Sequence, residues 1–230
     1  MGLNTAFNNR ITELIGSDYT TVASNSYIDL FNAAISEVAD MLPAELLLKY
    51  AVDPIDLSNS PDSWAHDGTA GGPEGKKILL VLRRESSGGV RRECNPVSIG
   101  EYYRSMDTGS LYLATKHTPI YAYVTDGGNT NISLFPLPTA SETAMIHYFE
   151  YPSLSDLAVS TIAGFPDEAF QAICLKASIN ILQAYISDFV QDEEDTEMLQ
   201  MLQAQLQSLQ AQFQGEMGRF IEQDATPRGE

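Results

Sequence analysis

The sequence predicts an α+β fold, in which the N- and C-terminal helices form a helical bundle domain and an antiparallel β domain is inserted between them. Three observations predict this class. Apolar residues recur every three or four positions at both ends of the chain, as on one face of a helix. Between residues 76 and 152 the apolar period changes to two, which is typical of half-buried strands. The 230 residues, 43% of them hydrophobic, are enough for a sizeable core.

The N-terminal part is predicted to form two helices. The apolar face of the longer one consists of Ile28, Phe31, Ile35, Val38 and Leu42. Pro43 is expected to end or kink this helix, because proline lacks the amide proton that helix continuation needs. A shorter amphipathic segment precedes it, with Phe7, Ile11, Leu14 and Ile15 on one side.

A stretch rich in Pro, Asp, Ser and Gly follows, over residues 52–75, and its composition is typical of a loop. We therefore assign residues 1–60 and 153–230 to the helical domain. Residues 61–75 are assigned to a linker loop, and residues 76–152 to the β domain.

Six strands are predicted in the β domain, over residues 76–84, 91–99, 110–115, 119–125, 131–137 and 144–151. Turn sequences separate them: Ser87-Gly88-Gly89, Asp107-Thr108-Gly109 and Asp126-Gly127-Gly128. Close spacing and short connections favour antiparallel pairing between neighbours, since parallel strands need long crossovers.

The C-terminal part returns to the helical period. Pro166 fits the first position of a helix, and Asp167 and Glu168 suit its first turn, where carboxylates face the positive end of the helix dipole. The last helix carries an apolar stripe that is expected to pack inside the helical domain: Leu199, Leu202, Leu206, Leu209 and Phe213. Beyond it, Gly215 and Gly218 are expected to loosen the helix. Met217, Phe220 and Ile221 would then lie on a loose end that a partner buries on assembly.

Charge is unevenly distributed along the chain. The net charge is −18, which disfavours general affinity for nucleic acid or anionic membranes. Most basic residues lie in the β region, whereas an acidic cluster separates the last two helices: Asp192, Glu193, Glu194, Asp195 and Glu197. This asymmetry predicts an intersubunit contact between the basic side chains Arg83, Arg84, Arg91 and Arg92 of one copy and an acidic helix of another. The alternative is an uneven charge pattern without function.

No catalytic, metal or cofactor motif is found in the sequence. His66, His117 and His147 are scattered, and none has a second potential ligand at metal-binding spacing. Cys94 and Cys174 are expected to be reduced thiols of a protein that is not secreted. The longest apolar runs are too short to span a bilayer. We therefore expect that the protein is not an enzyme and that it binds no cofactor, no metal and no membrane.

The order of elements resembles the head-to-tail adaptor (connector) proteins of tailed bacteriophages, the group that includes tubular tail protein A. The segments that carry the resemblance are "DMLPAELLLKYA", "SLYLATKHTPIYAYV", "NISLFPLP", "MIHYFEYPSLSDL", "FPDEAFQAICLKASINIL" and "DEEDTEMLQMLQAQLQSLQAQF". The resemblance covers residues 24–213, which is most of the chain.

The resemblance implies a structural virion protein, made in the host cytoplasm and located in the neck of the particle. It implies a dodecameric ring between the portal protein and the tail, with a channel through which DNA passes without specific binding. The helical domains would form the ring body, and the β elements would point toward tail proteins. The C-terminal Met217, Phe220 and Ile221 would dock on the portal. The acidic residues 192–197 would partly face the channel.

Two alternatives come from other functional classes. Pairs of tyrosines, Tyr102/Tyr103 and Tyr121/Tyr123, could stack on sugars or small ligands, which would make the β region a glycan- or ligand-binding module. An enzyme with a dispersed site is the other alternative. A ring seen by negative-stain microscopy would favour the adaptor, and saturable binding of a small molecule by a monomer would favour the alternatives.

Overall fold

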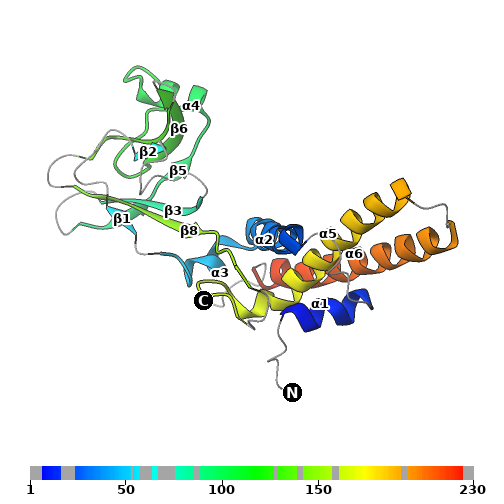
Figure 1. Cartoon of the computed structure of the whole chain (residues 1–230). Helices are drawn as coiled ribbons and strands as arrows, with labels where there is room; N and C mark the ends of the chain where they lie inside the picture. Colours follow the sequence, from blue (N-terminus) through cyan, green and yellow to red (C-terminus); the bar gives the residue numbers. More distant parts are fainter. Residues whose placement is uncertain are drawn as a thin grey trace. The chain divides into compact units, whose positions relative to one another are not determined.

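The structure, a computed structural model, describes residues 7–16, 24–52, 54–56, 64–66, 76–84, 89–126, 129–138, 142–156, 161–192 and 196–224. The chain divides into two compact units (Figure 1). Unit 1 combines Met1–Tyr50 with Tyr151–Glu230, and unit 2 is the intervening Ala51–Glu150. Unit 1 is helical and unit 2 contains two small sheets, so the predicted α+β class with a β insertion is confirmed.

Unit 1 is built around one central helix, α5 (Phe170–Asp192), which follows a short 3-10 turn at Asp167–Ala169. Three other helices pack against it: α1 (Phe7–Ile15), α2 (Ser24–Met41) and α6 (Thr196–Asp224). A further short helix, α3 (Ala44–Leu48), follows α2 after Pro43. The end of α2 at Met41 agrees with the stop expected at this proline.

The sequence of α5 explains its central place. Its residues 172–175 and 177–182 are all buried, which is the pattern of a helix covered on most of its faces. The stretch Asp167–Asp188 has a mean hydropathy of 1.2 and is the one described segment long and apolar enough to cross a membrane by length and composition alone. More than half of it, 56%, is buried within the protein, as in the core helix of a globular unit.

Aromatic rings and a few polar contacts join the helices of unit 1. The ring of Phe7 lies 4.9 Å from that of Phe31 and 4.5 Å from that of Phe170, which ties α1 to α2 and α5. Asn32 of α2 donates to the Leu154 carbonyl at 3.0 Å and accepts from the Leu154 amide at 2.8 Å. This pair of hydrogen bonds attaches the segment that returns from unit 2 to the helical core.

The first sheet of unit 2, sheet A, has the strand order β1-β8-β3-β4 and is antiparallel throughout. Its strands are β1 (Ile55–Asp56), β8 (Ala144–Glu150), β3 (Lys76–Arg84) and β4 (Arg91–Glu93). The second sheet, sheet B, has the order β2-β7-β6-β5. Its strands are β2 (Trp64–His66), β7 (Asn129–Phe135), β6 (Ile120–Asp126) and β5 (Asn95–Pro96).

Two buried clusters hold unit 2 together. The first takes Val81 from sheet A and Ile132 and Leu134 from sheet B, so the two sheets share a core. The second joins Tyr102 of α4 (Ile99–Met106) to Ile120 and Ala122 of β6. Helix α4 thus covers part of sheet B.

Several predicted strands differ from the observed ones. The segment predicted as one strand over residues 91–99 contains β4, β5 and the start of α4, and β5 pairs with β6 in parallel. Residues 110–115 form turns, with one isolated bridge between Thr115 and Thr118. The short strands β1 and β2 lie in stretches predicted to be loop or linker, and they pair with β8 and β7.

The missed helix α4 begins with a capping box. The Ser98 side chain accepts a hydrogen bond from the Glu101 amide at 3.3 Å, and the Glu101 carboxylate accepts one from the Ser98 amide at 3.1 Å. These bonds satisfy amides that a helix start leaves free, so the chain turns helical where alternation had predicted a longer strand.

Candidate functional site

Arg83 on β3 is fully buried, with 0% exposure. Its Nη2 atom donates to the Glu142 carboxylate at 2.7 Å, and its Nε atom donates to the Pro136 carbonyl at 2.8 Å. The same carboxylate also pairs with Lys116, whose side chain is half exposed. The expectation that Arg83 is available to a neighbouring subunit is therefore wrong, because this guanidinium is used to join β3 to the segment between β7 and β8.

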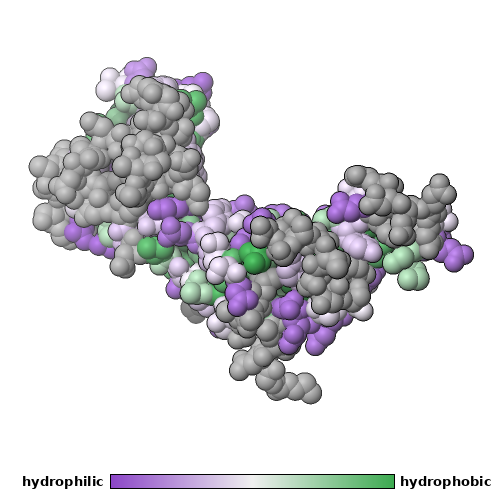
Figure 2. Space-filling model, viewed as in Figure 1, coloured by the Kyte–Doolittle hydropathy of each residue, from purple (hydrophilic) through white to green (hydrophobic). Residues whose placement is uncertain are grey.

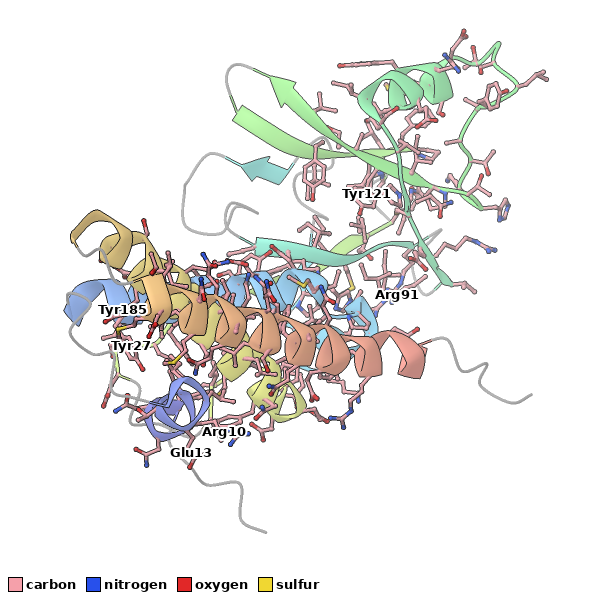
Figure 3. The ribbon with its side chains drawn as sticks, turned by 90° about the vertical axis from the view of Figure 1, so that its right-hand side faces the viewer. Arg10, Glu13, Tyr27, Arg91, Tyr121 and Tyr185 are labelled. Carbon is pink, nitrogen blue, oxygen red and sulfur yellow. The ribbon has the colours of Figure 1, made fainter. Side chains whose placement is uncertain are left out.

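The other three predicted basic residues lie where β3 pairs with β4, the edge strand of sheet A. Arg84 of β3 is opposite Arg91 of β4, and Arg83 is opposite Arg92. Like charges placed directly opposite repel each other, so an acidic group brought to this edge would relieve the repulsion. Arg91, labelled in Figure 3, is exposed, whereas Arg84 and Arg92 are half-buried. An intersubunit role for Arg84, Arg91 and Arg92 stays a prediction.

The predicted acidic cluster lies between the last two helices. Asp192 ends α5, and Glu197 is exposed in the first turn of α6. Glu193, Glu194 and Asp195 lie outside the described residues. A channel-facing role for these five residues stays a prediction.

The C-terminal apolar residues do not lie on a loose end. Helix α6 continues without interruption through Gly215 and Gly218 to Asp224. Met217 and Phe220 are buried, with exposures of 6% and 7%. The expectation of a loosened helix is wrong, because Met217 and Phe220 continue the three- and four-residue spacing of the stripe. The side chain of Ile221 lies outside the described ones.

The stripe itself packs as predicted. Leu202 and Leu209 are buried, and Leu199, Leu206 and Phe213 are half-buried. Helix α6 packs against α5 along this face, and Gln205 donates from its side chain to the Ile15 carbonyl at the end of α1, at 2.7 Å. The seam between α5 and α6 is therefore part of the core of unit 1.

Unit 2 exposes a large apolar surface that the sequence did not predict. It is formed by α4 and the turns that follow it, and we refer to it as the α4 surface. Its members are Ile99 (48% exposed), Tyr103 (56%), Met106 (39%), Leu111 (101%), Tyr112 (69%) and Leu113 (36%). In the space-filling view, hydrophobic atoms lie at the surface of unit 2 among hydrophilic ones (Figure 2). Clusters of exposed large apolar side chains are typical of surfaces that contact other molecules.

One cationic residue lies within the α4 surface. The guanidinium of Arg104 is 6.0 Å from the centre of the Tyr112 ring, within the range of a cation–π contact. Tyr, Met and Arg are the residue types that are enriched in protein interfaces. The capping-box sequence Ser98-Ile99-Gly100-Glu101 is the signal that could have revealed this helix.

The two tyrosine pairs each present one accessible ring. Tyr102 is buried, and its hydroxyl donates to the Leu134 carbonyl at 3.4 Å, whereas Tyr103 is exposed. Tyr121 of β6 (Figure 3) is half-buried, and burial raises the pKa of its hydroxyl to about 12, whereas Tyr123 is 49% exposed. Neither pair forms an open two-ring platform for stacking on a sugar.

Groups that could carry catalysis are dispersed in the described part of the chain. No group of three or more His, Cys, Asp or Glu side chains that could hold a metal is found there. Cys94 and Cys174 are buried free thiols, and burial raises the pKa of each to about 12, so neither is a thiolate near neutral pH.

A family model described as SU10 adaptor protein matches residues 5–229, nearly the whole chain. No curated protein matches the sequence.

Proposed function

Because the chain belongs to the SU10 adaptor protein family, a family of phage head-to-tail adaptors, we propose that it forms a ring between the capsid portal and the tail. Membership makes it a structural component of the virion at the head–tail junction, which associates with other head and tail proteins. The proposal adds three specific points to this: the ring is dodecameric, the portal is the head-side partner, and DNA passes through a channel in the ring. The family match over residues 5–229 carries it.

The two-unit organisation supports this function. An adaptor must contact different neighbours on two sides, and each unit of this chain has a core of its own. We propose that the helical unit 1 forms the ring body and that the β unit 2 is directed toward tail proteins. The portal contact then belongs to exposed residues of unit 1, since Met217 and Phe220 are buried in it.

The charge distribution supports a channel that does not retain DNA. Unit 2 contains 8 of the 13 Lys and Arg residues and 12 of the 31 acidic residues, a net charge of −4, which leaves −14 for unit 1. A wall with excess carboxylates repels phosphate, whereas a basic wall would bind it through counterion release.

Cryo-electron microscopy of purified particles tests the proposal. A ring of this protein, with twelve copies between portal and tail, is the expected result. A ring with another number of copies would correct the stoichiometry alone. Absence of the protein from the head–tail junction would overturn the function.

A further inference from the structure

The α4 surface presents large exposed apolar side chains together with a cation, Arg104. Its two tyrosines, its leucines and Met106 are exposed in the isolated chain, and the ring of Tyr112 lies next to Arg104. Arg104 is exposed; its guanidinium lies over the ring of Tyr112, and it also interacts electrostatically with Glu101 one turn earlier in α4. A partner that offers apolar atoms beside a carboxylate would match both properties, because the guanidinium can pair with a carboxylate while the rings are covered.

Unit 1 of the same chain carries a surface with this chemistry. Among its described residues, three large hydrophobic side chains are exposed: Met41 (46%), Met198 (37%) and Met201 (71%). Met198 and Met201 are three positions apart in the first turns of α6, and residues at this spacing share one helix face. Glu197, next to them, is exposed as well. We refer to Glu197, Met198 and Met201 as the α6 start.

We propose that the α4 surface of one copy packs on the α6 start of the next copy. Methionine sulfur makes favourable contacts with aromatic rings, so Met198 and Met201 suit the rings of Tyr103 and Tyr112. Arg104 would meet Glu197, which matches charge as well as apolar area. Both units are net negative, at −4 for unit 2 and −14 for unit 1, so the charge match of this contact is local and lies between Arg104 and Glu197.

The contact is heterologous: two different surfaces meet, and each copy keeps one of them for a further neighbour. Such a contact extends head to tail and closes into a ring when the rotation between copies permits. The inference rests on the proposed ring and assigns the residues through which neighbouring copies would bind. An isologous contact between two α4 surfaces would instead place two like-charged Arg104 residues in one interface and end at a dimer.

Sedimentation velocity on the full-length protein tests the contact with two singly blocked variants. Tyr112→Asp blocks the α4 surface, and Met201→Glu blocks the α6 start. Both positions are highly exposed, so both variants are expected to retain the circular dichroism spectrum of the wild type. The wild type is expected to associate as concentration rises. Each variant is expected to need at least about tenfold more protein for the same association, as for the loss of an interface anchor.

Mixing the two variants gives the sharpest readout. Each retains the surface that the other lacks, so a one-to-one mixture is expected to form a heterodimer and no larger species. Val90→Asp in unit 2 (65% exposed) and Met41→Glu in unit 1 are matched controls outside both surfaces, and both are expected to associate as the wild type does.

Three outcomes would overturn the contact: a wild type that stays monomeric at every concentration, variants that associate normally, or a mixture without the heterodimer. These results leave the proposed function standing if particles show a ring whose copies meet through other residues. Conversely, a normal heterodimer together with particles that lack the protein at the junction would overturn the proposed function and keep the contact.

Discussion

Arg83 combines complete burial with a charge, and the surrounding residues explain how this is tolerated. Its guanidinium is paired with Glu142 and donates to the carbonyls of Pro136 and Leu137. Removal of one member of a buried ion pair leaves the other charge uncompensated, which costs about 3–5 kcal/mol, whereas replacement of both by apolar groups is often close to neutral.

We therefore expect Arg83→Met to lower the free energy of unfolding of unit 2 by about 3 kcal/mol. The double variant Arg83→Met, Glu142→Leu is expected to lose less than the single variants combined, although Lys116 then loses its partner as well. Urea unfolding followed by fluorescence is the measurement, since Trp64, the one tryptophan of the chain, is in β2 of unit 2. A loss below about 0.5 kcal/mol for the single variant would contradict a structural role for the pair.

The two buried cysteines are expected to make the stability of the protein depend on pH in the alkaline range. Burial raises the thiol pKa of Cys94 and Cys174 from the ordinary value of 9.0 to about 12 in the folded protein. Between these values the unfolded chain loses protons that the folded chain keeps, so stability is full below pH 9 and declines as pH rises toward 12.

At pH 8 both thiols are expected to be unreactive toward a disulfide reagent in the folded protein. After unfolding in urea, both should react. The Cys94→Ala, Cys174→Ala double variant should lose less stability than the wild type when the pH is raised from 8 to 10. Rapid labelling of either thiol in the native protein at pH 8 would show that the site is accessible and would remove the basis for the pH prediction.

At the scale of the element, helix α6 contains two glycines at positions where the structure does not require glycine. A Cβ atom added at Gly215 or Gly218 meets nothing within 4 Å, and neither residue has a positive φ. Alanine in a helix interior is more favourable than glycine by about 0.5–1 kcal/mol, mainly because the unfolded chain loses less entropy on folding.

Gly215→Ala and Gly218→Ala are therefore each expected to raise the stability of unit 1 by about 0.5–1 kcal/mol, measured by chemical unfolding followed by circular dichroism. Gly164→Ala serves as the opposite control, since Gly164 has a φ of 75° and an alanine there would be strained. Destabilisation by Gly215→Ala would indicate that α6 needs flexibility at this point.

The elements also show where local patterns are sufficient. The strand predicted at residues 76–84 matches β3 at both ends, and the apolar faces of α2 and α6 are buried as expected. Alternation failed at residues 91–115, where the chain carries exposed Ile99, Leu111 and Leu113. Exposed apolar residues imitate a strand pattern, because periodicity reports which residues are apolar and not whether they are covered.

At the scale of the whole molecule, the acidic balance of unit 1 predicts weak contact with DNA. Full-length protein is expected to leave double-stranded DNA unshifted in gel electrophoresis at moderate salt. A variant with Asp192, Glu193, Glu194, Asp195 and Glu197 replaced by Asn or Gln loses five negative charges near one helix junction.

If these acids face the channel, particles that carry the neutralised ring should eject DNA more slowly, because phosphates would no longer be repelled there. Replacement of exposed acids elsewhere on unit 1, such as Asp167 and Glu168, is the matched control. Equal ejection rates for all three kinds of particle would contradict a channel-facing position of the cluster.

The division into two units leads to a prediction about folding. Residues 51–150, expressed alone, are expected to give a β-type circular dichroism spectrum and a cooperative unfolding transition, because both of the buried clusters described for unit 2 lie within these residues. A random-coil spectrum would show that unit 2 needs unit 1 to fold.

The sequence by itself determined the fold class, the elements with a clear period, and the resemblance to an adaptor family that the family match confirmed. These properties follow from patterns within continuous segments, and a period can be read without knowledge of the neighbours. Only the tertiary structure decided that Arg83 forms a buried ion pair and is not a surface cation, since its partner Glu142 is 59 positions away. It also decided that β5 pairs in parallel with β6, that Met217 and Phe220 are covered, and that the α4 surface is exposed. Burial depends on which distant segments meet, and this is settled by packing of the whole unit rather than by any local stretch of residues.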